Sequence, residues 1–97
     1  MAVPVQAEQR REHRQRVLKG ASILNGITNS EVSCMIRNMN KGGAELRISV
    51  ESRIPQEFLL YVPTDGIAYQ CVLAWRAGDR VGVKFTGTAP KPHWHYG

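Results

Sequence analysis

AELRISV, residues 44–50, is the stretch of this 97-residue chain that decides the fold class. Leu46, Ile48 and Val50 share one parity, and charged or polar residues stand between them. Successive side chains of a β-strand point to opposite faces, so this alternation predicts a strand that buries one face. The three apolar residues are therefore expected in the core and the polar ones in solvent.

The same period of two recurs on both sides of this strand. Further strands are predicted at 17–24, 31–37, 58–62, 69–75 and 81–85. Turn signals separate them, namely Asn25-Gly26, the segment 38–43, Pro63-Thr64-Asp65-Gly66 and Gly78-Asp79. Six short strands with frequent turns and no sustained helical period predict an all-β protein, an antiparallel barrel or sandwich.

The length suits one domain. Residues 1–16 are polar and charged and are expected to form a flexible basic arm, residues 17–86 the β-domain, and residues 87–97 a disordered tail. Five basic residues and two glutamates among residues 1–20 give this segment a net charge of +3, within a total of +5. The excess favours anionic partners without identifying one.

Several classes of protein are excluded by composition and motif. No apolar run approaches the roughly 20 residues of a membrane-spanning helix, and no secretory signal is apparent, so a cytoplasmic protein is expected. No catalytic constellation is found, which argues against an enzyme. His93 and His95 lack further ligands nearby, so we expect no metal and no cofactor.

Cysteines and aromatic residues fit the interior of the predicted sheet. Cys34 and Cys71 fall at apolar strand positions without CxxC spacing, and they are expected to be small core residues rather than a disulfide. Tyr69 and Trp75 are expected to be core aromatics, with ligand stacking as the alternative. Arg76 follows on the opposite face, where it either lines a binding surface or is solvated at a strand end.

Two polar motifs carry the functional information. Arg10 and Arg14 are spaced as RxxxR ahead of the first strand, and guanidinium groups hold phosphates bidentately and stack on bases. The turn Asn38-Met39-Asn40-Lys41-Gly42-Gly43 adds polar side chains and a glycine where a small ligand can approach the backbone. Neither motif is specific alone, but their order along the chain is informative.

Taken in order, these blocks resemble the PilZ domain, a small bacterial β-barrel that binds the second messenger cyclic di-GMP. The likeness spans roughly residues 10 to 85. It is carried by RREHR at 10–14 as RxxxR, NMNKGGA at 38–44 as the [DN]xSxxG element, VLAWR at 72–76, and GVKF at 82–85.

The resemblance implies a six-stranded antiparallel barrel whose arginine arm closes over a nucleotide. By position, Arg10 and Arg14 would contact phosphates and guanine faces, Asn38 would bond a guanine edge, and Gly43 would leave room for the ligand. Asn40 stands where the motif has serine, and it either replaces the hydroxyl contact or obstructs the pocket. Arg11 and Arg16 either grip a second nucleotide or remain solvated.

The function expected from these features is a cyclic di-GMP receptor or adaptor that orders its arm on binding and signals to a partner protein in trans. One alternative is a degenerate PilZ-like module that does not bind the nucleotide and acts through protein contacts. Another is a basic barrel that binds single-stranded nucleic acid. The pathway, the partner, the ligand stoichiometry and the oligomeric state do not follow from the sequence.

Overall fold

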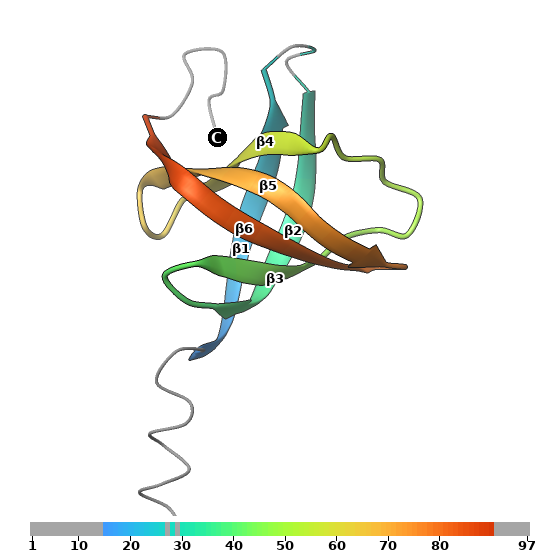
Figure 1. Ribbon diagram of the computed structural model, residues 1–97, viewed down its shortest axis with the longest axis horizontal. Helices are drawn as coiled ribbons and strands as arrows, with labels where there is room; N and C mark the ends of the chain where they lie inside the picture. The colour runs from blue at the N-terminus through green and yellow to red at the C-terminus, as the bar shows by residue number, and fades with distance from the viewer. Residues whose placement is uncertain (1–14, 27, 29, 91–97) are drawn as a thin grey trace, which may run out of the picture.

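The computed structural model describes residues 15–26, 28 and 30–90 of the chain. Within these residues, six β-strands and no helix are found. They are β1 (Gln15–Asn25), β2 (Ser30–Met39), β3 (Gly43–Arg47), β4 (Glu57–Val62), β5 (Ile67–Ala77) and β6 (Arg80–Ala89). The strands close into an antiparallel barrel in the order β1-β2-β3-β6-β5-β4, so the all-β prediction and the barrel are confirmed (Figure 1).

The barrel forms because the inward positions of each strand are apolar. These positions build one core, whose members are Ala21, Ile23, Cys34, Ile36, Leu46, Ile48, Phe58, Leu60, Val62, Cys71, Val81 and Val83. Both cysteines are free and buried, as predicted. Burial raises the pKa of each thiol to about 12, which leaves them as unreactive core residues.

The turns follow the sequence signals. Gly66 and Gly78 have φ values of 69° and 65°, a region that other residues rarely adopt.

Tyr69 packs against the core and stacks on Phe85 with 4.7 Å between ring centroids. No helix among the described residues has the length and apolar character needed to cross a membrane.

Two strands are longer than the alternating pattern predicts, because their ends pair with a neighbouring strand. β1 begins at Gln15 rather than Val17, because Gln15 and Arg16 pair with the end of β2. Likewise β6 continues to Ala89, because residues 87–89 pair with the start of β5. Residues 15, 16 and 87–89 are therefore strand residues of the barrel. The expectations for residues 1–14 and 91–97 lie outside the described residues.

The prediction that Val50 is a core residue is wrong. β3 ends at Arg47, and Val50 is 65% exposed in the loop between β3 and β4. Arg76 holds this loop by donating hydrogen bonds to the carbonyl oxygens of Ser49, Val50 and Ser52. The guanidinium of Arg76 thus fixes the path of a loop, a role that neither interpretation of the sequence included.

Candidate functional site

A row of directly paired residues crosses the outside of the barrel beside the turn that the sequence singled out. In order across the sheet, its members are Asn38 on β2, Glu45 on β3, Gly82 on β6 and Trp75 on β5, and the backbone of Asn38 pairs in turn with that of Arg16 on β1. We call these four residues, Asn38, Glu45, Gly82 and Trp75, the cross-strand row. Directly opposed residues of antiparallel strands share a face, so the row brings distant parts of the sequence onto one surface.

A β-bulge in β2 turns Asn38 onto this surface. Ile36 pairs with Leu46 and Asn38 with Glu45, so β2 carries one more residue than β3 between these pairs. The extra residue reverses the alternation. As a result Ile36 is buried, Asn38 is half-buried on the outside, and Met39 packs against the core.

A second bulge does the same to Trp75, which the sequence pattern placed in the core. Leu73 pairs with Val83 and Trp75 with Gly82, which leaves one extra residue in β5. Leu73 packs on the core, whereas Trp75 is 44% exposed, so the prediction of a core tryptophan is wrong. The indole lies against Gly82, where a Cβ atom would collide with its ring. The absence of a side chain at Gly82 thus lets the exposed indole of Trp75 lie against β6, and we call this indole the aromatic platform.

Charged side chains surround the middle of the row. The Nε of Arg80 donates to Oε2 of Glu45 at 2.7 Å, and its guanidinium carbon lies 5.9 Å from the centre of the Trp75 ring. The hydrogen bond to Glu45 raises the pKa of Arg80, whose guanidinium is always charged in proteins. Asn38 Nδ2 donates to Oε1 of Glu45 over a long 3.4 Å.

These groups line a polar hollow of about 340 Å³ on the barrel surface. Its lining residues are Arg37, Asn38, Glu45, Arg47 and Arg80. Arg47 also lies 3.4 Å from the carboxylate of Asp79. Three guanidiniums face two carboxylates here, so the hollow carries net positive charge and suits an anionic ligand with polar edges.

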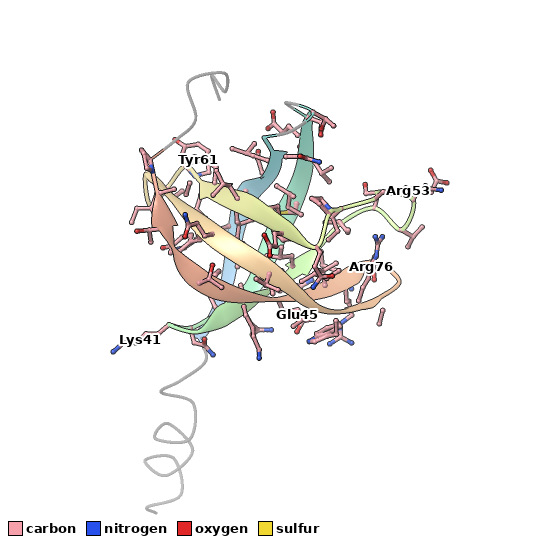
Figure 2. All side chains as sticks on the ribbon, turned by 45° about the horizontal axis from the view of Figure 1, so that its top comes forward. Lys41, Glu45, Arg53, Tyr61 and Arg76 are labelled. Atoms are coloured by element: carbon pink, nitrogen blue, oxygen red, sulfur yellow. The ribbon has the colours of Figure 1, made fainter. Side chains whose placement is uncertain are left out.

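The turn between β2 and β3 is built around Asn40. Its side-chain oxygen accepts hydrogen bonds from the backbone N–H groups of Gly42 and Gly43, at 2.7 and 2.9 Å. This Asx-type turn exposes Lys41 at its tip, which projects away from the barrel (Figure 2). Asn40 therefore shapes the turn through its oxygen, a role that the hydroxyl of serine also fills.

Gly43 is required by packing. A Cβ atom at this position would collide with the carbonyl oxygen of Val83 on the neighbouring strand β6. The sequence assigned this glycine to close approach of a ligand, and the structure adds close approach of a second strand. Gly43 thus fixes where β3 meets β6 and, with it, the registration of Glu45 opposite Gly82.

The start of β1 lies at the same end of the barrel as this turn (Figure 1). Gln15 pairs with Met39 and Arg16 with Asn38. Arg14 immediately precedes Gln15 in the sequence, so the RxxxR segment joins the barrel beside the turn. Arg10, Arg11 and Arg14 themselves lie outside the described residues.

Comparison with known proteins decides the family. The sequence model of the PilZ domain family matches residues 8–93 of the chain. The chain belongs to the PilZ domain family. A search of the curated proteins found no match. PilZ domains are cyclic di-GMP receptors that act by binding and not by catalysis. The matched range includes the RxxxR segment as well as the whole cross-strand row.

Within this PilZ domain, sequence reasoning found the turn residues but missed several members of the surface. Glu45, Arg37 and Arg47 alternate with the core positions, so their place on the outer face was evident, but nothing marked them as neighbours of Asn38. Arg80 carried no signal, and Gly82 was noted only as part of the GVKF block, with nothing to indicate that it lies beneath Trp75. No cluster of three or more potential metal ligands occurs in the part of the chain that the structure describes.

Proposed function

We propose that this PilZ domain is a cyclic di-GMP receptor that holds the nucleotide between its RxxxR segment and the cross-strand row. The observation that carries the proposal is the pairing of Gln15 with Met39 and of Arg16 with Asn38. Because of this register, the segment that ends at Arg14 enters the sheet next to Asn38. The arginines of the first motif and the polar groups of the second thus belong to one site.

The chemistry of the ligand matches the groups gathered here. Cyclic di-GMP carries two phosphates and two purine rings. Arg10 and Arg14 supply guanidiniums for the phosphates and for stacking, with Arg11 and Arg16 as further cations. Asn38 supplies an amide that both donates and accepts hydrogen bonds, and it is suited to a guanine edge. The exposed indole of Trp75 offers a face for a base, which revives the stacking role that the sequence left as an alternative.

Asn40 and Gly43 act on the ligand mainly through the turn. The oxygen of Asn40 is engaged by the backbone of Gly42 and Gly43, so its amide nitrogen is the part of the side chain suited to a ligand contact. In this proposal the asparagine preserves the turn that presents Asn38 and does not obstruct the site.

The output of the receptor is a changed surface. Ligand phosphates offset the mutual repulsion of the arm's positive charges and hold the arm against the barrel beside Asn38. A protein partner in trans then reads the ordered arm. Since cyclic di-GMP is a messenger made inside bacterial cells, we expect the receptor to act in the cytoplasm. Backbone order parameters of residues 8–15 should rise when cyclic di-GMP is added.

The test is a calorimetric titration of the whole chain with cyclic di-GMP, GTP and a short single-stranded oligonucleotide at two salt concentrations. We expect cyclic di-GMP to bind and the other two to bind much more weakly. Arg14→Ala should lower the affinity for cyclic di-GMP at least about tenfold, which corresponds to the loss of about 1.4 kcal/mol from a charge-assisted contact.

Arg53→Ala is the matched control. Arg53 is an exposed arginine of the β3–β4 loop, which projects on the other side of the barrel from Lys41 in the view of Figure 2. Its removal changes the net charge equally and should leave the affinity unchanged. Absence of cyclic di-GMP binding in the unaltered protein would favour the degenerate PilZ-like module. Oligonucleotide binding that falls steeply with salt would favour the nucleic-acid alternative.

A further inference from the structure

Glu45 is an acidic residue in the middle of a surface that we assign to an anionic ligand. Its side chain is only 18% exposed, and it lies directly opposite Asn38 on one side and Gly82 on the other. A carboxylate at this place repels phosphate, so it weakens binding unless it makes a compensating contact with another part of the ligand. The position of Glu45 within the row indicates which part that is.

Trp75, the platform for a base, belongs to the second strand from this carboxylate, and only β6 lies between them. Trp75 pairs with Gly82, which in turn pairs with Glu45, and the indole lies over the bare backbone of Gly82. Neighbouring strands are about 4.8 Å apart, so the indole bridges much of the space between β5 and β3. A purine stacked on this ring has one of its edges within reach of the Glu45 side chain.

Guanine is the base whose edge complements a carboxylate. Its Watson–Crick edge presents two adjacent donors, N1–H and the 2-amino group, whereas adenine presents an acceptor at N1. An ionised carboxylate only accepts hydrogen bonds, and its two oxygens accept about four in total. We propose that Glu45 accepts hydrogen bonds from N1–H and the 2-amino group of a guanine stacked on Trp75, and that it makes the site select guanine. This inference rests on the function proposed above.

Arg80 is the positioning residue for this contact. Its Nε donates to Oε2 of Glu45 at 2.7 Å, while its guanidinium also lies over part of the Trp75 ring, with its central carbon 5.9 Å from the ring centre. The ion pair therefore holds the carboxylate next to the platform. The contact of Asn38 Nδ2 to Oε1 is long, at 3.4 Å, and is therefore a weak hydrogen bond.

The test compares cyclic di-GMP with cyclic di-IMP, which differs only in lacking the 2-amino groups. Calorimetric titrations are run on the unaltered protein, Glu45→Gln and Glu51→Gln. Glu51 is exposed in the β3–β4 loop and provides the same change of charge outside the row. We expect the unaltered protein to prefer cyclic di-GMP by about tenfold or more, the usual effect of one charge-assisted hydrogen bond. Glu45→Gln should bind cyclic di-GMP about tenfold less tightly and lose most of this preference, and Glu51→Gln should retain both.

A melting curve of each variant accompanies the titrations. Should Glu45→Gln fail to fold, Glu45→Asp keeps the charge and draws the carboxylate back by one methylene, and it should lose the preference in the same way. Tighter cyclic di-GMP binding by Glu45→Gln, or an unchanged preference over cyclic di-IMP, would show that Glu45 is only the counter-ion of Arg80. Failure of the unaltered protein to bind cyclic di-GMP would overturn the proposed function together with this inference.

Discussion

At the scale of single residues, two glycines shape the candidate site because they have no side chain. Gly82 leaves room for the indole of Trp75, and Gly43 leaves room for the backbone of Val83. In both cases the methyl group of an alanine would overlap a neighbouring residue, Trp75 or Val83. The difference between the two is that a side chain can move aside, whereas the paired backbone of β6 cannot move without breaking the sheet.

We predict that Gly43→Ala destabilises the barrel. The new Cβ atom would collide with the Val83 carbonyl oxygen, so the β3–β6 pair must separate, at a cost of about 1–3 kcal/mol. For a domain of this size, each kcal/mol lowers Tm by roughly 4–8 °C in thermal unfolding followed by circular dichroism.

The control for this change is Gly20→Ala in β1. Nothing lies within 4 Å of a Cβ atom built on Gly20, so its substitution should leave Tm unchanged or slightly raised. If Gly43→Ala melts at the temperature of Gly20→Ala, packing is not the reason for glycine at position 43.

At the scale of elements, the alternation of the sequence predicted where strands occur but not where they shift. Apolar residues at every second position mark an inward face, and Ile36 and Leu46 lie in the core as expected. The bulges next to Asn38 and Trp75 arise from how β2 and β5 pair with strands elsewhere in the chain. A periodic pattern read along one strand holds no information about these partners, so Trp75 was assigned to the wrong face.

The sequence likewise predicted the local part of the candidate site but not the part that depends on strand pairing. Asn38, Asn40 and Gly43 form a local turn, whose polar residues and glycine are visible in the sequence. The alignment of Glu45 with Gly82 and Trp75 depends on strand register, which only the closed barrel fixes.

Another element whose conformation depends on a distant residue is the loop between β3 and β4. Arg76 on β5 donates hydrogen bonds to the carbonyl oxygens of Ser49, Val50 and Ser52, at 3.2, 3.1 and 2.6 Å. Its Nε also donates to Gly78 within the β5–β6 turn. One planar guanidinium thus joins two connecting segments, which are also linked by the hydrogen bond from the Ile48 N–H to the Asp79 carbonyl oxygen at 2.9 Å.

We predict that Arg76→Ala releases this loop. Loss of charge-assisted hydrogen bonds to carbonyl groups should cost about 1–3 kcal/mol in the free energy of unfolding. The amide of Ser52, which donates to Ser49 at 3.0 Å, should lose its protection in NMR hydrogen exchange, whereas core amides such as that of Leu60 remain protected below global unfolding.

Arg47→Ala is a suitable control, because the exposed Arg47–Asp79 pair should contribute little. Unaltered protection of the Ser52 amide in Arg76→Ala would mean that the loop keeps its path through its own backbone hydrogen bonds.

At the scale of the whole molecule, β1 serves both the site and the closure of the barrel. Its first residues pair with β2 beside Asn38, and its last ones close the barrel by pairing with β4. Between these two regions, Lys19 bonds the carboxylate of Asp65 in the β4–β5 turn at 2.9 Å. The hydroxyl of Tyr69 donates to the other oxygen of Asp65 at 3.2 Å. This cluster therefore adds a side-chain link between β1 and the β4–β5 turn, where the pairing of β1 with β4 is short.

We predict that this cluster makes the barrel less stable in acid. The hydrogen bond from Lys19 holds the pKa of Asp65 below its ordinary value of 3.8. A carboxyl group whose pKa is lower in the folded state stabilises the fold above the unfolded value. That contribution is lost as the pH falls from about 4 through the folded value. Asp65→Asn should therefore lower stability near neutral pH by about 1 kcal/mol, the upper range for an ion pair at a protein surface.

The measurement is thermal unfolding of the unaltered protein, Asp65→Asn, Lys19→Ala and the double variant between pH 2 and pH 7. The difference between the unaltered protein and Asp65→Asn should shrink as the pH falls, because the protonated carboxyl no longer attracts the ammonium. At pH 7, Lys19→Ala should lose a similar amount, and the double variant should lose less than the sum of the two single changes. Strictly additive losses, or a difference that persists undiminished at pH 2, would show that Asp65 stabilises the turn by itself and that the barrel closes without its help.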